Sequence, residues 1–404
     1  MLRRKQIILG SLIVLLASEF AYASGSPPQT QEPAATKDRP LIEVDLHKFA
    51  DANWNPTNGN TPGGTLGSAI YFADGTSLVW SWLTRDNAPS PWSKDVSPPP
   101  QPAHLHAVRL DALTGEERAQ QDWSLSSSAV RYELVQNGNF LTCIDNKIRL
   151  FSGEFQLLRE VELAPPGICS RLVYLAVCGV SPSRRSILVS SISRQERISE
   201  ILDTRALTAI STANEDKSVT ITAISDHWLV GLCGNPWEVC IRKVDGSWKA
   251  FRFAGPENQP TCVLGRAYFV NDETVLICRL NEMATANVDG SVIFRVNLPK
   301  DRSCENSLPA TSSEGGRFAM MENRQLGIDE FFDMGPFWTD DRILVYDVSE
   351  QRAVFAVKVN GASQWPSSRT HSNEFALSPD GKRLAVVSDG ILNVYKLPDR
   401  QAAR

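Results

Sequence analysis

Short apolar segments separated by polar turns dominate the chain from residue 69 onward. The stretch 375–398 shows the pattern most completely. Two apolar runs flank Ser378-Pro379-Asp380-Gly381, and a third run follows a second Asp-Gly pair. Apolar runs bounded by Gly, Pro and Asp are typical of β-strands joined by tight turns. This stretch is therefore predicted to form three successive antiparallel strands.

The same strand–turn–strand pattern occurs six more times upstream. The first apolar residues after the turns are separated by 62, 47, 41, 47, 43 and 66 residues. Two further strand-like segments follow each of the first six copies, which gives four strands per repeat. Four strands with a period in the forties are typical of a β-propeller blade. The copies occupy residues 69–82, 132–144, 176–191, 221–233, 267–280, 310–322 and 375–388.

The last repeat lacks one strand. After its second strand only the segment 391–397 precedes the polar tail 399–404, whereas residues 41–49 read as a strand with no partner nearby. Pairing these two segments closes a ring and removes an exposed sheet edge. We therefore predict an all-β fold, a seven-bladed β-propeller over residues 41–398, with the N-terminal strand completing the last blade. Six or eight blades stay open, because the two longest separations can hide or mimic a repeat.

The segment SPDGKRLAVVSDGILNVYKLP resembles the repeats of WD-repeat-like and secreted bacterial β-propellers. Tyr395 stands where such repeats often carry Trp, and Tyr346-Asp347 stands where they carry Trp-Asp. Blades two to five contain no Trp-Asp dipeptide. The resemblance implies an architecture and no particular activity, because propellers host many functions.

The first 23 residues are typical of a secretory signal peptide. Basic residues at positions 3–5 precede an apolar run at 7–17, and Ala-Tyr-Ala at 21–23 is a small-x-small cleavage motif. The apolar run is too short to form a stable membrane span. We expect export to the periplasm or the extracellular space, with an uncleaved anchor as the alternative. Residues 24–40, rich in Ser, Pro, Gln and Thr, are predicted to form a disordered linker.

The charge balance narrows the classes of partner. The chain carries 41 basic and 46 acidic residues, and removal of residues 1–23 leaves 38 and 45. A mildly acidic surface argues against nucleic acid and anionic membrane as main partners. No later stretch is apolar enough for a transmembrane helix. The remaining candidates are a protein, a peptide or a glycan.

All eight cysteines follow the predicted cleavage site. An even number of cysteines in an exported chain favours disulfides. Cys233 and Cys240 flank a turn-like segment, and Cys262 and Cys278 flank one arm of a predicted hairpin, so both pairs are disulfide candidates. Buried free thiols are the alternative for either pair.

Two long insertions, at residues 84–103 and 323–340, follow the second strand of the first and sixth repeats. In a propeller these positions emerge on one face, and long loops on a rigid scaffold often carry binding residues. Aromatic rings beside carboxylates can bind a sugar, a cationic group or a peptide. The alternative is that the rings plug the channel or cover the blades. The candidate ligand-binding residues are Trp92, Phe331, Phe332, Asp333, Phe337 and Trp338.

Catalytic motifs do not stand out. The chain contains no G-x-S-x-G, H-E-x-x-H or Gly-rich phosphate loop, so no catalytic residue and no cofactor is predicted. His104 and His106 lie two apart at a strand start and can share a face as metal ligands do, but no third ligand is evident. We therefore predict a secreted binding module. The alternatives are a glycan-processing hydrolase or lyase with carboxylates near the central channel, and a surface-assembly protein that binds another protein.

Overall fold

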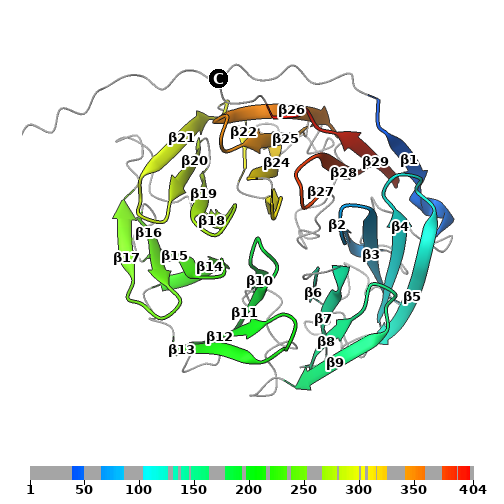
Figure 1. Cartoon of the computed structure of the whole chain (residues 1–404), viewed down its shortest axis with the longest axis horizontal. Coiled ribbons are helices and arrows are strands. Elements are labelled where there is room, and N and C mark those ends of the chain that lie inside the picture. Colours follow the sequence, from blue (N-terminus) through cyan, green and yellow to red (C-terminus); the bar gives the residue numbers. More distant parts are fainter. Residues whose placement is uncertain are drawn as a thin grey trace, which may run out of the picture.

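The structure is a computed structural model of the chain. Within the described residues the chain forms 29 β-strands, one short 3₁₀ helix and no α-helix. The strands make seven separate antiparallel sheets arranged as a ring (Figure 1). The fold is a seven-bladed β-propeller, which confirms the prediction from the repeats. The described residues are 39–49, 65–85, 103–125, 131–134, 138–144, 147–162, 178–192, 197–214, 219–233, 238–252, 266–279, 282–299, 302–304, 308–314, 316–324, 342–359, 375–388 and 390–400.

Each of the first five blades is a four-stranded meander that runs from the inside of the ring to the outside in chain order. Blade 1 comprises β2 (Thr65–Phe72), β3 (Ser77–Arg85), β4 (Ala103–Asp111) and β5 (Glu117–Leu125). Blade 2 comprises β6 (Arg131–Leu134), β7 (Phe140–Ile144), β8 (Lys147–Phe151) and β9 (Leu157–Glu162). Blade 3 comprises β10 (Cys178–Val180), β11 (Ser186–Ile192), β12 (Arg197–Asp203) and β13 (Ala209–Asn214). Blade 4 comprises β14 (Val219–Ile224), β15 (Trp228–Cys233), β16 (Glu238–Lys243) and β17 (Lys249–Arg252). Blade 5 comprises β18 (Arg266–Phe269), β19 (Thr274–Arg279), β20 (Glu282–Asn287) and β21 (Val292–Asn297).

The last two blades depart from this plan. In blade 6 two short strands replace the inner strand, because β22 and β23 pair with opposite ends of β24. In blade 7 the outer strand comes from the other end of the chain. Blade 6 comprises β22 (Arg302–Ser303), β23 (Ala310–Thr311), β24 (Arg317–Arg324), β25 (Arg342–Asp347) and β26 (Arg352–Lys358). Blade 7 comprises β27 (Phe375–Leu377), β28 (Arg383–Ser388), β29 (Ile391–Lys396) and β1 (Ile42–Asp45).

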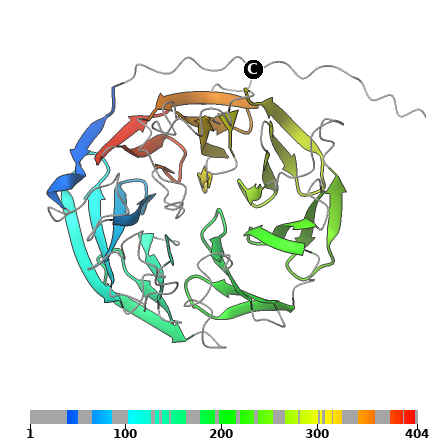
Figure 2. The ribbon, with the colours of Figure 1, turned by 180° about the vertical axis from the view of Figure 1, so that it is seen from behind.

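The ring closes as the sequence predicts, and Figure 2 shows β1 alongside the last strands of the chain. β1 pairs antiparallel with β29, with Val44 opposite Leu392. The predicted strand over residues 41–49 is too long, however, because Leu46–Lys48 forms the 3₁₀ helix η1. The Asp45 side chain accepts a hydrogen bond of 3.0 Å from the His47 amide, and this local bond turns the chain out of the extended conformation.

The hydrophobic core lies between the blades rather than at one centre. Seven clusters of buried side chains occur, and each spans two neighbouring blades around the ring. The cluster between blades 7 and 1 contains Leu46 of η1 together with Trp80 and Trp82 of β3. Because both faces of each sheet are covered, the second strands read as continuous apolar runs rather than as alternating ones.

The two faces of the ring differ in what they carry. The first and second strands of each blade are joined on one side, here called the turn face, for example at residues 73–76 and 378–382. Neighbouring turns bond to one another there: Ser183 donates to Asp226 at 2.6 Å, and the Glu314 amide donates to the Pro379 carbonyl at 2.9 Å. The second strand of each blade ends on the opposite side, the loop face.

Candidate functional site

The six predicted ligand-binding residues lie outside the described residues, so their roles stay predictions. They are Trp92, Phe331, Phe332, Asp333, Phe337 and Trp338. The structure does describe the strand ends from which both insertions leave. β3 ends at Arg85 and β4 begins at Ala103, while β24 ends at Arg324 and β25 begins at Arg342. Both pairs of ends lie on the loop face, in blades that only blade 7 separates (Figure 1).

A chain of three polar side chains occupies the loop-face end of blade 1. The Nδ1 atom of His106 lies 2.6 Å from Oδ1 of Asp122, and its Nε2 atom lies 2.9 Å from Oγ1 of Thr84. A carboxylate only accepts hydrogen bonds, so Nδ1 carries a proton and donates to Asp122. In the neutral ring Nε2 then accepts, and the Thr84 hydroxyl donates to it. The result is a directed hydroxyl–imidazole–carboxylate chain.

Aromatic stacking fixes the plane of the His106 ring. Trp82 stacks on it with centroids 5.0 Å apart and 14° between the planes, and Trp80 stacks on Trp82 at 4.1 Å. Both Trp rings are almost fully buried, whereas 15% of the His106 side chain and 55% of the Asp122 side chain are exposed. The chain is thus rigid on its inner side and accessible on its outer side. Such an arrangement can orient a ligand by hydrogen bonds.

His104 and His106 share a face of β4, as the sequence predicts. Their ring centroids are 6.2 Å apart, and His104 Nδ1 lies 3.5 Å from the Ser124 hydroxyl. Both ring nitrogens of His106 are engaged by Thr84 and Asp122, which leaves neither for a metal ion. Among the residues that the structure describes, no group of three or more potential metal ligands occurs.

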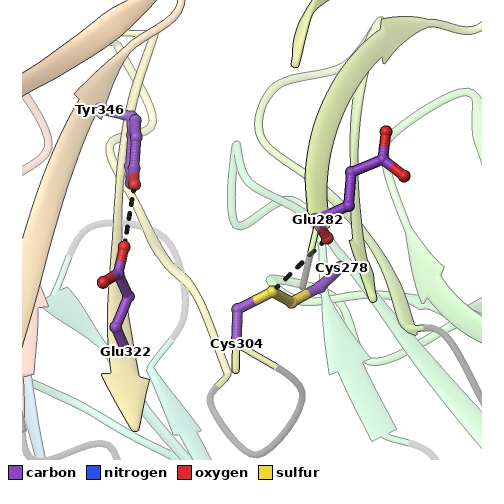
Figure 3. The surroundings of a disulfide bond; sticks show 5 residues. All are labelled: Cys278, Glu282, Cys304, Glu322 and Tyr346. Carbon is purple, nitrogen blue, oxygen red and sulfur yellow. Dashed lines mark hydrogen bonds between the residues drawn. A yellow bond between two sulfur atoms is a disulfide. The ribbon is translucent and has the colours of Figure 1, made fainter. Parts of the chain in front are cut away.

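A second polar cluster lies where the insertion of blade 6 begins and ends. Glu322 on β24 pairs in register with Arg342 on β25, and Arg342 donates to its carboxylate from Nε at 2.9 Å and from Nη2 at 2.8 Å. The Tyr346 hydroxyl donates to Glu322 Oε1 at 3.3 Å, as Figure 3 shows. The carboxylate is almost fully buried, at 3% exposure. A buried carboxylate needs such partners, because desolvation without them is costly.

A disulfide joins Cys278 of β19 to Cys304, opposite the Glu322–Tyr346 pair in Figure 3. The predicted pairing of Cys278 with Cys262 is therefore wrong. The side chain of Cys278 faces blade 6 and packs in the same buried cluster as Cys304, rather than toward the end of its own hairpin arm. Cys304 Sγ also lies 4.0 Å from the Glu282 carbonyl oxygen. The other predicted pair, Cys233 and Cys240, is joined, and its bond staples β15 to β16.

Sequence reasoning missed two members of the blade 1 chain, Thr84 and Asp122. Each comes from a different strand, and only the registers of β3 with β4 and of β4 with β5 bring them to His106. Counting outward from the predicted turns on alternate positions would have placed all three on one face. The buried pair Glu322–Arg342 was missed because an insertion separates its members in sequence, and only the register of β24 with β25 brings them together.

Comparisons with known proteins give similarity in fold alone. No protein-family model matches the chain, and no curated protein matches its sequence. The Pan2 WD40 domain of Neurospora crassa is 9% identical, with a TM-score of 0.49 over 91% of this chain and 99% of that one. Streptogramin B lyase is 10% identical, with a TM-score of 0.47 over 84% and 95%. Hsv2 of Kluyveromyces lactis is 11% identical, with a TM-score of 0.44 over 80% and 89%. These values carry no information on ligand or activity.

Proposed function

We propose that this propeller is an exported binding module that holds a protein, peptide or glycan ligand at its loop face, over blades 6, 7 and 1. The observation that carries the proposal is the position of the two insertions. Each leaves the same face, and each rises from an ordered polar cluster, one around His106 and the other around Glu322. A rigid base of this kind fixes the strand ends from which a binding loop leaves, and fixed anchor points lower the entropy lost on binding.

Export is supported by the N-terminal sequence and by the disulfides. Residues 1–23 have the basic, apolar and small-residue regions of a signal peptide. Two disulfides occur in the described part of the chain, and such bonds persist in oxidising compartments. That same part contains no helix with the length and hydrophobicity of a membrane span.

The proposal is tested by binding to glycan and peptide arrays. The chain is produced in an oxidising compartment. The glycans and peptides that it binds are compared with those bound by a variant carrying F331A, F332A and W338A. Loss of three aromatic contacts at an interface centre is expected to weaken binding by about 30-fold or more. Thermal melting should stay nearly unchanged.

A matched control is the double variant L157A/L158A on β9. Both leucines are more than half exposed and lie on a blade without a long insertion, so binding should match that of the parent. Unchanged binding by the triple variant would contradict the proposal. A large fall in the melting temperature of the triple variant would instead show that these aromatic side chains plug the central channel or cover the blades.

A glycan-processing hydrolase or lyase is the second candidate. The observation in its favour is the directed chain Thr84–His106–Asp122, which holds a proton acceptor beside the insertion of blade 1. The array glycans are incubated with the chain and analysed by mass spectrometry for cleavage. Cleavage that H106N abolishes would favour the enzyme, and intact glycans throughout would exclude it for these substrates.

A further inference from the structure

The turn between β10 and β11 in blade 3 repeats the turn of blade 7. Its sequence is Ser-Pro-Ser-Arg-Arg-Ser over residues 181–186, against Ser-Pro-Asp-Gly-Lys-Arg over residues 378–383. The first Ser of each turn accepts hydrogen bonds from the two amides at the far end of the turn, through its hydroxyl. The amide of the fourth residue donates to the carbonyl of the first, at 2.7 Å in blade 3 and 2.8 Å in blade 7. The two turns are therefore structurally equivalent.

One position in this turn breaks the equivalence. Gly381 has a φ of 67° in blade 7, and Arg184 takes its place in blade 3 with a φ of 63°. In the described first turns of the other blades, every residue with such a left-handed backbone is glycine, as at Gly138 and Gly316. A non-glycine residue in this conformation costs about 1 kcal/mol. The side chain of Arg184 is thus present despite a local conformational cost.

The Arg184 side chain reaches across the inside of the ring. Its Nη1 atom donates a hydrogen bond of 2.8 Å to the carbonyl oxygen of Phe72, at the inner end of blade 1. Blade 2 lies between the two residues in the ring, and Figure 1 shows the β10–β11 turn projecting toward the middle. The guanidinium group therefore lies among the inner strands rather than on the outer surface.

This guanidinium has no carboxylate to balance its charge among the described residues. Enclosure by protein lowers the pKa of Arg184 to about 10, and the nearby Tyr71 opposes this effect. The acidic residues in the first turns of blades 4 and 1 have other partners. Asp226 accepts from Ser183 at 2.6 Å, and Asp74 accepts from Arg109 at 3.0 Å. The other enclosed arginine at a first turn, Arg317, has Asp347 as its counter-charge at 2.8 Å.

We propose that Arg184 anchors a binding site for a small oxyanion, such as phosphate, on the inside of the ring near the turn face. A guanidinium group has five N–H donors, and a single carbonyl oxygen is the partner of Arg184 among the described contacts. Its planar fork matches two oxygens of one phosphate or carboxylate group. A partly desolvated cation of this kind is stabilised by an anion, because removing it from water without a counter-charge is costly. The side chain is half-buried, so part of it remains accessible to a ligand.

The experiment is isothermal titration of the folded chain with inorganic phosphate, with sodium chloride added to the same ionic strength as the reference. The parent is expected to bind one phosphate per chain. The variant R184Q should bind at least about tenfold more weakly, because a charged bidentate contact is lost. The matched control is R185Q, which removes the exposed neighbouring charge and should leave the affinity unchanged.

Several results would overturn the proposal. These are a parent that binds no phosphate, a parent that binds chloride as well as phosphate, and an R184Q variant that binds like the parent. If R184Q does not fold, R184K decides, since lysine keeps the charge but lacks the planar fork. An R184K affinity equal to that of the parent would contradict the bidentate contact, because the positive charge without the planar fork would then suffice to hold the anion. Binding by R184Q equal to that of the parent would leave Arg184 as only a brace between blades 3 and 1.

Discussion

At the residue scale, Asp347 organises the junction between blades 6 and 7. Its carboxylate is fully buried and accepts hydrogen bonds from Arg317 at 2.8 Å and from Arg400 at 2.9 Å. Arg317 also donates to the carbonyl oxygens of Gly381 and Pro398, so one ion pair connects two blades and the end of the last strand. Burial by itself raises the pKa of Asp347. The hydrogen bonds from Ser349, Arg317 and Arg400 outweigh burial and lower that pKa to about 2.

The variant D347N is expected to lower the free energy of unfolding by about 3 kcal/mol at neutral pH, because it leaves Arg317 buried without a counter-charge. The folded pKa of Asp347 lies below its ordinary value of 3.8, so the unfolded chain takes up the proton first. The stability that the carboxylate contributes is thus present above pH 4 and is lost as pH falls toward 2. Denaturant unfolding of the parent and D347N should show their difference shrinking over that range. D399N, at an exposed position, is the control, and a difference that did not change with pH would contradict this account.

At the element scale, the short pairing of β1 with β29 closes the molecule. The four-residue strand supplies the outer edge of blade 7, and η1 then places Leu46 in the core between blades 7 and 1. Gly115 meets this element closely, since a Cβ atom at that position would contact the Val44 side chain. The N-terminal segment is therefore packed against blade 1 as well as paired with blade 7.

The variant L46A is expected to reduce the free energy of unfolding by about 2–5 kcal/mol, because it removes a fully buried leucine and leaves a cavity at the closure. L41A is the matched control, since half of the Leu41 side chain is exposed and its truncation should change stability little. Deletion of residues 41–49 should destabilise the ring more than L46A does. A deletion variant with the melting temperature of the parent would refute closure by this strand.

At the scale of the whole molecule, stability depends on seven similar interfaces between blades. Of the two disulfides in the described part of the chain, one lies within a blade and the other links two neighbouring blades. Cys233–Cys240 lies within one hairpin of blade 4 and closes a separation of 7 residues. Cys278–Cys304 closes a separation of 26 residues and joins the second strand of blade 5 to the residue that follows β22 in blade 6. The second bond thus restrains the chain over a longer distance and between two blades.

The double variants C278A/C304A and C233A/C240A are expected to lose about 3.5 and about 2.4 kcal/mol, respectively, because the longer closure removes more entropy from the unfolded chain. Denaturant unfolding under oxidising conditions measures both values. Peptide mapping of the parent without reduction should recover the two linkages. The reverse order of losses would show that contacts between the blades, rather than the loop closure, set the contribution of each bond.

The sequence by itself determined the architecture of this protein. Strand, turn and strand are local features, and they follow from apolar runs and from turn residues such as Asp380-Gly381. The sequence shows both that the last repeat lacks a strand and that the segment at 41–49 has no partner nearby. Closure of the ring by pairing these segments follows, because an exposed sheet edge is unfavourable. The length of β1 was the error, since the bond from the His47 amide to Asp45 ends the strand early.

Only the tertiary structure decided how the chemistry is distributed. Thr84, His106 and Asp122 meet through the register of three strands, and Cys278 bonds to Cys304 because its side chain faces the neighbouring blade. Arg184 contacts Phe72 from a distance of 112 residues in sequence. Pairings of this kind depend on which face a side chain takes and on how the blades meet around the ring. The local sequence pattern determines neither the face that a side chain takes nor the blade that it contacts, because the same alternation of residues fits several registers and several neighbours.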